Sequence, residues 1–416
     1  MSGRRVPETD SPDVNGAALP ARRAPGADAA PRRAALSALA SSPDAGRVHL
    51  LGMDAQRMRD WVASLGQPAY RAAQVLQWIY EKNADSFEQM TNLSKELRTR
   101  LAEQACLYSM RVVQQSDSAD GTRKLLLACG DGAAVETVWI PADGRNTACL
   151  SSQVGCPVGC RFCASGIDGV QRDLSPGEIV EQALHIRRLI RQHTPAAEAA
   201  AGNEPGGRLS HIVMMGMGEP LANYEAVVAA IRILNAPWGL NVGARKITVS
   251  TVGLPRQIRR LADEQLQLNL ALSLHAPDED LRRELIPWGK VRLPDLLDAC
   301  AYYFQKTGRE ITLEYVLLAR VNDHAAHARK LAAIARRLRA NINLLRYNPV
   351  PGLPFERPTA EAAHQFQQQL RSAGANAHLR TSRGRDVAAA CGQLRRQAIA
   401  PVSPAGADAD AANPVG

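Results

Sequence analysis

Apolar residues recur every three or four positions in the segment that follows residue 47, which predicts a small helical domain over residues 48–108. Asp54 is a good N-cap for the first helix, and Gly66 is a good stop for it. The runs AYRAAQVLQWIYEKN and SKELRTRLAEQA continue the same spacing. We therefore expect a compact helical accessory domain of an RNA-binding type at this end of the chain.

The pattern changes to one typical of β-strands over residues 109–145. The stretches MRVVQQS, TRKLLLACG and AAVETVWIPA are rich in strand-forming residues, and GDG between the last two is typical of a turn. We interpret this segment as a β-strand linker region between two domains.

From residue 146 to residue 399, short apolar runs alternate with amphipathic helical runs. Strands are expected at 147–153, 211–215, 246–251, 268–275, 311–319 and 342–348. Ser175, Pro176 and Glu178 form a capping-box start for the first intervening helix. This alternation predicts an α/β fold with a covered parallel sheet, either open or curled into an incomplete barrel. Catalytic groups in such folds lie at the carboxyl ends of the strands.

The two ends of the chain are poor in large apolar residues. Residues 1–47 and 400–416 consist mainly of Ala, Pro, Gly, Arg and Asp, so we expect both to be disordered. The first tail lacks the apolar core of a secretory signal, and its acidic residues argue against a mitochondrial presequence. The segment 193–208 is expected to be a long loop or an insertion. No apolar run approaches the ~20 residues of a membrane span, and we expect a cytoplasmic protein.

The composition adds a basic charge to this picture. With 45% apolar and 22% charged residues, the chain is neither fibrous nor wholly disordered. Its formal net charge of +9 is compatible with a polyanionic partner. Arginine dominates the basic residues and suits phosphate contacts, although genomic base composition explains the same bias. The candidates for RNA contact, each of which is also explained as a solvated surface residue, are Arg259, Arg260, Arg282, Arg283, Arg380, Arg383 and Arg385.

The strongest chemical signal is a group of cysteines. Cys156, Cys160 and Cys163 fall in the run CPVGCRFC directly after a predicted strand. A structural zinc site takes four protein ligands, usually as two CxxC pairs, and no second pair exists in the sequence. Three thiolates leave one iron of a four-iron cluster open for chemistry. The alternatives are a structural zinc or a chance run of core cysteines.

At these residues the chain resembles the radical S-adenosylmethionine superfamily, whose hallmark is this triad with an aromatic residue, here Phe162, before the last cysteine. Gly218-Glu219-Pro220 matches a second feature of that superfamily. The resemblance implies an incomplete (β/α)6 barrel and a 4Fe–4S cluster, on which S-adenosylmethionine is bound and cleaved to a radical. It also implies that Glu219 contacts the methionine ammonium group.

Further motifs resemble the bacterial adenine-C2 methyltransferases that act on 23S ribosomal RNA, at the peptidyl transferase centre, and on transfer RNA, at the adenosine 3′ of the anticodon. The motifs are CLSSQVGCPVGCRFCASG, MGMGEPLANY, KITVSTVG, LALSLHAP, RYNPV and RTSRGRDVAAACGQL. The resemblance also covers the N-terminal helical domain. It implies cluster ligands Cys156, Cys160 and Cys163, and a site for S-adenosylmethionine formed by Gly218, Glu219, Ser250, Ser273, Leu274, His275 and Asn348.

The resemblance gives roles to three further residues. Adenine C2 is poorly nucleophilic, so in this family Cys391 first takes a methyl group from one S-adenosylmethionine. A second molecule is cleaved, and the methyl group, converted to a radical, adds to C2. Glu136 is the implied proton acceptor. Cys149 then attacks the Cys391 sulfur and frees the product as a transient disulfide. Two molecules of S-adenosylmethionine are used per turnover, the electron donor is a flavodoxin or ferredoxin, and we expect a monomer.

Two other functions stay open from the sequence. Sibling enzymes methylate adenine C8 with a similar pair of cysteines. A non-catalytic iron–sulfur or zinc protein that binds RNA would need neither Cys149 nor Cys391.

Several of these residues also have ordinary structural interpretations. Cys391 alone could be a buried core cysteine, His275 a core histidine, and Glu136 a solvent-facing carboxylate. We expect the remaining cysteines in the core: Cys106, Cys129 and Cys300. The segment before Cys391 departs from the family, because Arg385, Val387 and Ala388 stand where acidic residues are usual.

Overall fold

The computed structural model describes residues 46–194, 207–288 and 291–394. The predictions for residues 1–45, for the tail from residue 395 onward and for most of the loop at 193–208 lie outside the described residues. Among the described helices, none is both long enough and apolar enough to cross a membrane.

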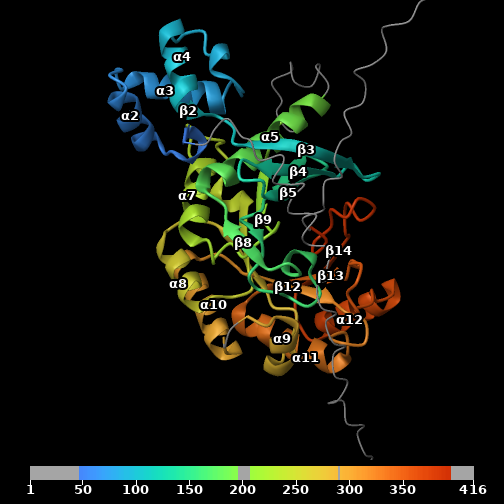
Figure 1. The fold of residues 1–416 in the computed structure, drawn as a ribbon. Helices are drawn as coiled ribbons and strands as arrows, with labels where there is room; N and C mark the ends of the chain where they lie inside the picture. Colours follow the sequence, from blue (N-terminus) through green and yellow to red (C-terminus); the bar gives the residue numbers. More distant parts are fainter. Residues whose placement is uncertain (1–45, 195–206, 289–290, 395–416) are drawn as a thin grey trace, which may run out of the picture.

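The first described segment forms the predicted helices, which are α2 (Ala55–Ser64), α3 (Tyr70–Tyr80) and α4 (Lys95–Gln104). The Asp54 carboxylate accepts a hydrogen bond from the Arg57 nitrogen at 2.8 Å, and Ser94 caps α4 in the same way. Two short strands that the pattern did not predict, β1 (Val48–His49) and β2 (Ala105–Cys106), pair in parallel. This pairing joins the two ends of the helical domain, which stands at one end of the molecule next to α5 (Figure 1).

In the described part of the chain, ten strands form one sheet in the order β14-β13-β12-β11-β10-β9-β6-β5-β4-β3. Its parallel part contains β6 (Arg145–Cys149), β9 (His211–Met214), β10 (Ile247–Thr251), β11 (Asn269–Ser273), β12 (Thr312–Leu317), β13 (Asn341–Arg346) and β14 (Ala377–Arg380). These strands lie side by side in chain order, so every crossover steps in the same direction. This order is that of a barrel and not of a doubly wound sheet.

The three strands predicted over 109–145 are confirmed as β3 (Met110–Asp117), β4 (Arg123–Cys129) and β5 (Ala134–Ala142). They do not form a separate linker. β5 pairs antiparallel with β6, so the three strands extend the barrel sheet. The connection is a tight turn in which Gly144 has a φ of 62°, a conformation that glycine adopts without strain.

Two strand predictions differ from the structure. The run 147–153 leaves the sheet after Cys149, because the Ser152 nitrogen turns to the Met217 carbonyl at 2.8 Å. The chain then forms β7 (Gln153–Gly155), which pairs with β8 (Val170–Asp173). Strand β14 was missed because its sequence, AHLR, is short and has no apolar run.

Helices connect the parallel strands: α5 (Pro176–His193), α7 (Tyr224–Asn235), α8 (Pro255–Asp263), α9 (Glu279–Leu285), α10 (Leu293–Thr307), α11 (Ala325–Leu338) and α12 (Ala360–Ser372). Single turns of 3₁₀ helix lie at Leu50–Gly52, Phe87–Gln89, Ala164–Gly166 and Ala244–Lys246. The predicted capping box begins α5, since Ser175 and Glu178 exchange side-chain to backbone hydrogen bonds. The helices lie along the outside of the strands (Figure 1).

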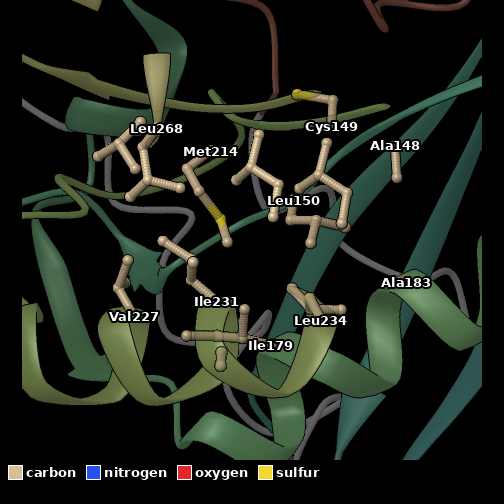
Figure 2. Packing of buried hydrophobic residues seen from close by; sticks show 14 of the residues in the cluster. Ala148, Cys149, Leu150, Ile179, Ala183, Met214, Val227, Ile231, Leu234 and Leu268 are labelled. Carbon is tan, nitrogen blue, oxygen red and sulfur yellow. The ribbon is translucent and has the colours of Figure 1, made fainter. Parts of the chain in front are cut away.

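The core forms where these helices pack on the sheet. Figure 2 shows Ile179, Ala183, Val227, Ile231 and Leu234 of α5 and α7 against Ala148, Leu150 and Met214. Burying a side chain of this kind stabilises the fold by roughly 1.5–3 kcal/mol. Cys149 points to the opposite side of β6 from the helices, because side chains alternate along a strand. The end of β6 therefore directs this thiol into the barrel.

Helix α5 also attaches the helical domain to the barrel. The Glu181 carboxylate is fully buried and accepts hydrogen bonds from the nitrogens of Ser109 at 2.9 Å and Met110 at 2.7 Å. It also lies 3.3 Å from the His49 Nε2. Further along the helix, the buried Arg187 guanidinium donates to the carbonyl groups at the end of α3. The two domains are thus joined by buried polar groups.

Candidate active site

The cysteine triad lies on the loop between β7 and β8. The Cys156 nitrogen donates to the Gly169 carbonyl at 3.1 Å, and the Cys163 nitrogen donates to the Cys160 carbonyl at 3.2 Å, so the loop folds back on itself. Burial raises the pKa of Cys156 to about 12 and raises that of Cys160 well above its ordinary value. Metal binding to these thiols would therefore release protons.

The triad faces an open cavity at the carboxyl ends of the parallel strands, with an empty volume of about 920 Å³. Most of the predicted site residues line it, namely Cys156, Cys160, Cys163, Gly218, Glu219, Ser250, Ser273, His275 and Cys391. The fold therefore brings these residues together from distant parts of the chain, at the edge of the sheet where the α/β pattern predicts catalytic groups.

Glu219 forms a buried wall of the cavity. Its two carboxylate oxygens accept hydrogen bonds from the nitrogens of Leu221 at 3.0 Å and Val252 at 2.9 Å. Burial nevertheless raises the pKa of Glu219 to about 7. The preceding Gly218 has a φ of 106°, and a Cβ there would lie 2.8 Å from the Gln153 nitrogen. Only glycine fits this turn without a shift of the backbone.

The ends of β10 and β11 provide a second polar wall. The hydroxyl oxygens of Ser250 and Ser273 lie 3.3 Å apart. The His275 Nδ1 accepts a hydrogen bond from the Val316 nitrogen at 3.1 Å, and its ring packs edge-on against Phe162. Burial lowers the pKa of His275 to about 3, so the ring is neutral and carries its proton on Nε2. His275 is thus a well-packed histidine that also lines the cavity.

Cys391 is exposed and lies on the irregular segment after β14, so its interpretation as a buried core cysteine is wrong. The next residue, Gly392, accepts a hydrogen bond at its carbonyl from the Ala164 nitrogen at 2.8 Å. The Asn348 side-chain nitrogen donates to the Cys391 carbonyl at 3.2 Å. These two bonds hold the segment between the triad loop and the end of β13.

Cys149 is buried at the end of β6 and is not among the residues that line the cavity. The Thr137 hydroxyl donates to its carbonyl at 2.8 Å. Burial raises the pKa of the Cys149 thiol, and the nearby Cys391 raises it further. Glu136, Leu274 and Asn348 also lie outside the lining. Leu274 is buried and donates its N–H to the Glu314 carbonyl at 3.1 Å, while Asn348 orients the Cys391 segment.

Glu136 is buried on β5, so its interpretation as a solvent-facing carboxylate is wrong. Its carboxylate oxygen lies 2.8 Å from the Lys124 Nζ, and the two side chains are 2% and 5% exposed. The Glu136 carbonyl accepts a hydrogen bond from the Ser151 hydroxyl at 2.6 Å, and that hydroxyl accepts one from the Met217 nitrogen at 2.9 Å. The backbone of Glu136 is thereby linked to the turn that carries Glu219.

Glu314, which no sequence motif predicted, is buried on β12 and lines the cavity. Its carboxylate accepts a hydrogen bond from the Asn343 side-chain nitrogen at 3.0 Å and lies 4.0 Å from the Arg380 guanidinium. Burial raises the pKa of Glu314. The available signal was a carboxylate inside the apolar run ITLEYVLLA, where a buried parallel strand is otherwise apolar.

The structure separates the arginine candidates. Arg282 is buried and donates to the carbonyl of Val252, so it is not an RNA contact. Arg260 and Arg283 pair with neighbouring carboxylates, and Arg259 stacks over Tyr302. Arg380, Arg383 and Arg385 lie on or just after β14, on the segment that leads to Cys391. Cys106, Cys129 and Cys300 are buried, as predicted.

The donor set of the triad fits an iron–sulfur cluster. Among the described residues, no three His, Cys, Asp or Glu side chains are grouped so as to hold one metal ion. A four-iron cluster is larger than an ion, and each of its protein ligands binds a different iron. Three thiols of one loop that face a cavity beside a buried carboxylate suit such a group.

Comparisons with known proteins agree with this site. Residues 48–107 match the family described as the ribosomal RNA large subunit methyltransferase N-terminal domain, and residues 150–332 match the radical SAM superfamily. A probable dual-specificity RNA methyltransferase RlmN from Gloeobacter violaceus is 46% identical over 84% of this chain and 96% of its own length. One from Thermosynechococcus vestitus is 47% identical over 83% and 98%.

A solved structure extends the likeness to three dimensions. The crystal structure of a radical SAM methyltransferase from Sphaerobacter thermophilus matches with a TM-score of 0.78 and 43% identity, over 84% of this chain and 99% of that one. These identities hold over almost the whole length of the relatives. The chain therefore belongs to the RlmN family of radical S-adenosylmethionine methyltransferases.

Proposed function

We propose that this protein methylates C2 of adenine in 23S ribosomal RNA and in transfer RNA. One observation carries the proposal. The exposed Cys391 is hydrogen-bonded through its segment to the cysteine-triad loop, and it lies close enough to the buried Cys149 to raise the pKa of that thiol. The names of the relatives, which are dual-specificity RNA methyltransferases, support the substrate class.

Cys156, Cys160 and Cys163 would hold the 4Fe–4S cluster. When bound, the cluster and two successive molecules of S-adenosylmethionine supply a methyl group for a thiol and the radical that activates it. Glu219, fixed by two backbone N–H groups, offers its carboxylate to the methionine ammonium group. The hydroxyls of Ser250 and Ser273 and the neutral His275 also line the cavity, Leu274 is buried next to His275, and Asn348 holds the Cys391 segment through the Cys391 carbonyl.

Three residues then act on the base. Cys391 is exposed, so it can carry the methyl group to the adenine and remain bonded to C2 through it. Glu136 takes the proton that C2 loses. Cys149 attacks the Cys391 sulfur, which breaks the bond between that sulfur and the methylene carbon and leaves a disulfide. The raised pKa of Cys149 makes a thiolate there scarce until its surroundings change.

RNA would approach the mouth of the cavity, where Arg380, Arg383 and Arg385 precede Cys391. A base reached in this cavity must leave its stack. We propose a monomer in the cytoplasm, supplied with electrons by a flavodoxin or ferredoxin.

The test is anaerobic reconstitution with iron and sulfide, followed by reaction with protein-free 23S RNA or transfer RNA, S-adenosylmethionine and a reductant. We expect 5′-deoxyadenosine and 2-methyladenosine, identified by mass spectrometry of the nucleosides. Methylation at C8 would assign the protein to the sibling activity. Absence of both products, with a cluster present, would overturn the proposal and leave a non-catalytic RNA-binding protein.

A further inference from the structure

The turn between β3 and β4 holds the segment that leads to Cys391. We call this turn, residues 118–122, the clasp. The Asp386 carboxylate accepts hydrogen bonds from the Ser118 hydroxyl at 2.6 Å and the Ala119 nitrogen at 3.0 Å. In the other direction, the Asp120 carboxylate accepts one from the Gly384 nitrogen at 2.9 Å. In Figure 1 the end of the described chain lies beside this hairpin.

Lys124 follows the clasp and connects it to the interior. Its Nζ lies 2.8 Å from the Glu136 carboxylate and donates to the Ala388 carbonyl at 3.1 Å. One ammonium group therefore contacts the implied proton acceptor and the main chain three residues before Cys391. The first contact joins β4 to the neighbouring strand β5. The second joins β4 to the C-terminal segment, which is far from β4 in the sequence.

Strand register places these groups on one face of the sheet. Lys124 is opposite Val138, and Val138 is opposite Cys149. Glu136 is two residues from Val138, and side chains two residues apart share a face. Lys124, Glu136 and Cys149 therefore lie on the same face of the sheet. Figure 2 shows that Cys149 points away from the helices, so this face is the one turned toward the inside of the barrel.

The buried ion pair between Lys124 and Glu136 is weak evidence that Lys124 serves only to stabilise the fold. Removing both charges from water costs free energy that offsets much of their attraction. Lys124 stands at the start of the run LLLAC, where an apolar side chain would pack against the same core. Lysine presents a compact charge with three donors, and two groups from different segments, the Glu136 carboxylate and the Ala388 carbonyl, lie within reach of it. These contacts favour a role for Lys124 in the reaction.

We propose that Lys124 is a positioning residue, which fixes the Glu136 carboxylate relative to Cys391 so that the proton acceptor meets C2 of the tethered base. The inference rests on the proposed function. In the step concerned, the C2–H bond breaks, an O–H bond forms on Glu136, and the bonding pair stays in the purine ring. The unpaired electron left by radical addition passes to a one-electron acceptor, for which the oxidised iron–sulfur cluster would serve. Release by Cys149 then follows. When Cys149 breaks the S–C bond, the electron pair of that bond goes to the methylene carbon, which takes a proton and becomes the methyl group.

The experiment measures three quantities in the reconstituted enzyme with RNA: methylation of Cys391, formation of 5′-deoxyadenosine, and the covalent adduct between RNA and the Cys391 peptide. The variants are Lys124→Met and Lys124→Arg. We expect Lys124→Met to keep the first two within threefold of wild type, and to slow product release at least tenfold so that the adduct accumulates. Lys124→Arg, which keeps the charge, should recover most of the release rate.

Two further variants make the test specific. Asp386→Ala loosens the clasp but keeps both contacts of Lys124, with the Glu136 carboxylate and with the Ala388 carbonyl, so it should accumulate much less adduct than Lys124→Met. Lys124→Met/Glu136→Gln removes both buried charges, which protects the fold, and should accumulate adduct as Lys124→Met does. Normal release by Lys124→Met, or loss of Cys391 methylation in it and in the double variant, would overturn the inference while wild type remains active. A wild-type enzyme that makes no methyladenosine would overturn the proposed function as well.

Discussion

Cys391 and Cys149 differ in exposure, and this difference allows the two thiols to be tested separately. Cys391 is exposed, whereas Cys149 is buried. In Cys149→Ala, methylation of Cys391 and addition to the base should proceed, but no thiolate remains to attack the Cys391 sulfur. We expect a covalent adduct between protein and RNA, visible as a mass increase on the Cys391 peptide after nuclease trimming. Cys391→Ala and Cys149→Ala/Cys391→Ala should show no adduct, and normal turnover by Cys149→Ala would refute the two-cysteine mechanism.

We expect Glu219 to make the free energy of unfolding depend on pH. Burial raises its pKa from an ordinary value of 4.5 to about 7. Between these pH values the folded protein holds a proton that the unfolded chain has released, so stability falls as pH rises through this window. The shift corresponds to about 3 kcal/mol. Urea unfolding of the cluster-free protein at pH 5 and pH 8 should show this loss, and Glu219→Gln should lack it. An equal loss in the variant would mean that other groups cause it.

At the scale of elements, helix α5 is the joint between the two domains. Glu181→Ala would leave the buried nitrogens of Ser109 and Met110 without their carboxylate partner. Leaving a buried donor without an acceptor costs about 1–3 kcal/mol for each group. We expect faster hydrogen exchange at β1 and β2 and a lower free energy of unfolding. Glu181→Gln, which keeps one acceptor, should lose less, and unchanged exchange in Glu181→Ala would show that the joint lies elsewhere.

Elements with long periodic patterns were predictable, whereas short ones were not. The capping residues Asp54, Ser175 and Glu178 mark helix starts that the structure confirms, because caps act locally. Strands β1, β2 and β14 have two to four residues and depend on partners distant in the chain. The same reason explains why the segment 109–145 looked like a linker. Only the pairing of β5 with β6 shows that it belongs to the barrel.

At the scale of the whole molecule, the cavity residues could be named from motifs because they follow strands in fixed order. Nine of them do line one cavity. Contacts between distant segments could not be read from the sequence. The burial of Glu136, the approach of Lys124 to Ala388 and the position of Glu314 all depend on how the sheet curls. The sequence does show a charged residue within a largely apolar strand pattern at Lys124 and at Glu314, and this local feature alone marks the two residues as unusual.

The ten-stranded sheet has two ends, β3 and β14, and in the described chain these ends meet through the clasp instead of through a strand ladder. The ring thus has a seam. Separating two neighbouring parallel strands would break all the backbone hydrogen bonds between them. Separating β3 from β14 at the seam would break only the few hydrogen bonds of the clasp, each worth about 1 kcal/mol net. Cys391 lies just beyond that seam. The weakest link of the ring therefore lies next to the cysteine that we propose to carry the methyl group, and in the described sheet every other pair of neighbouring strands is held by a ladder.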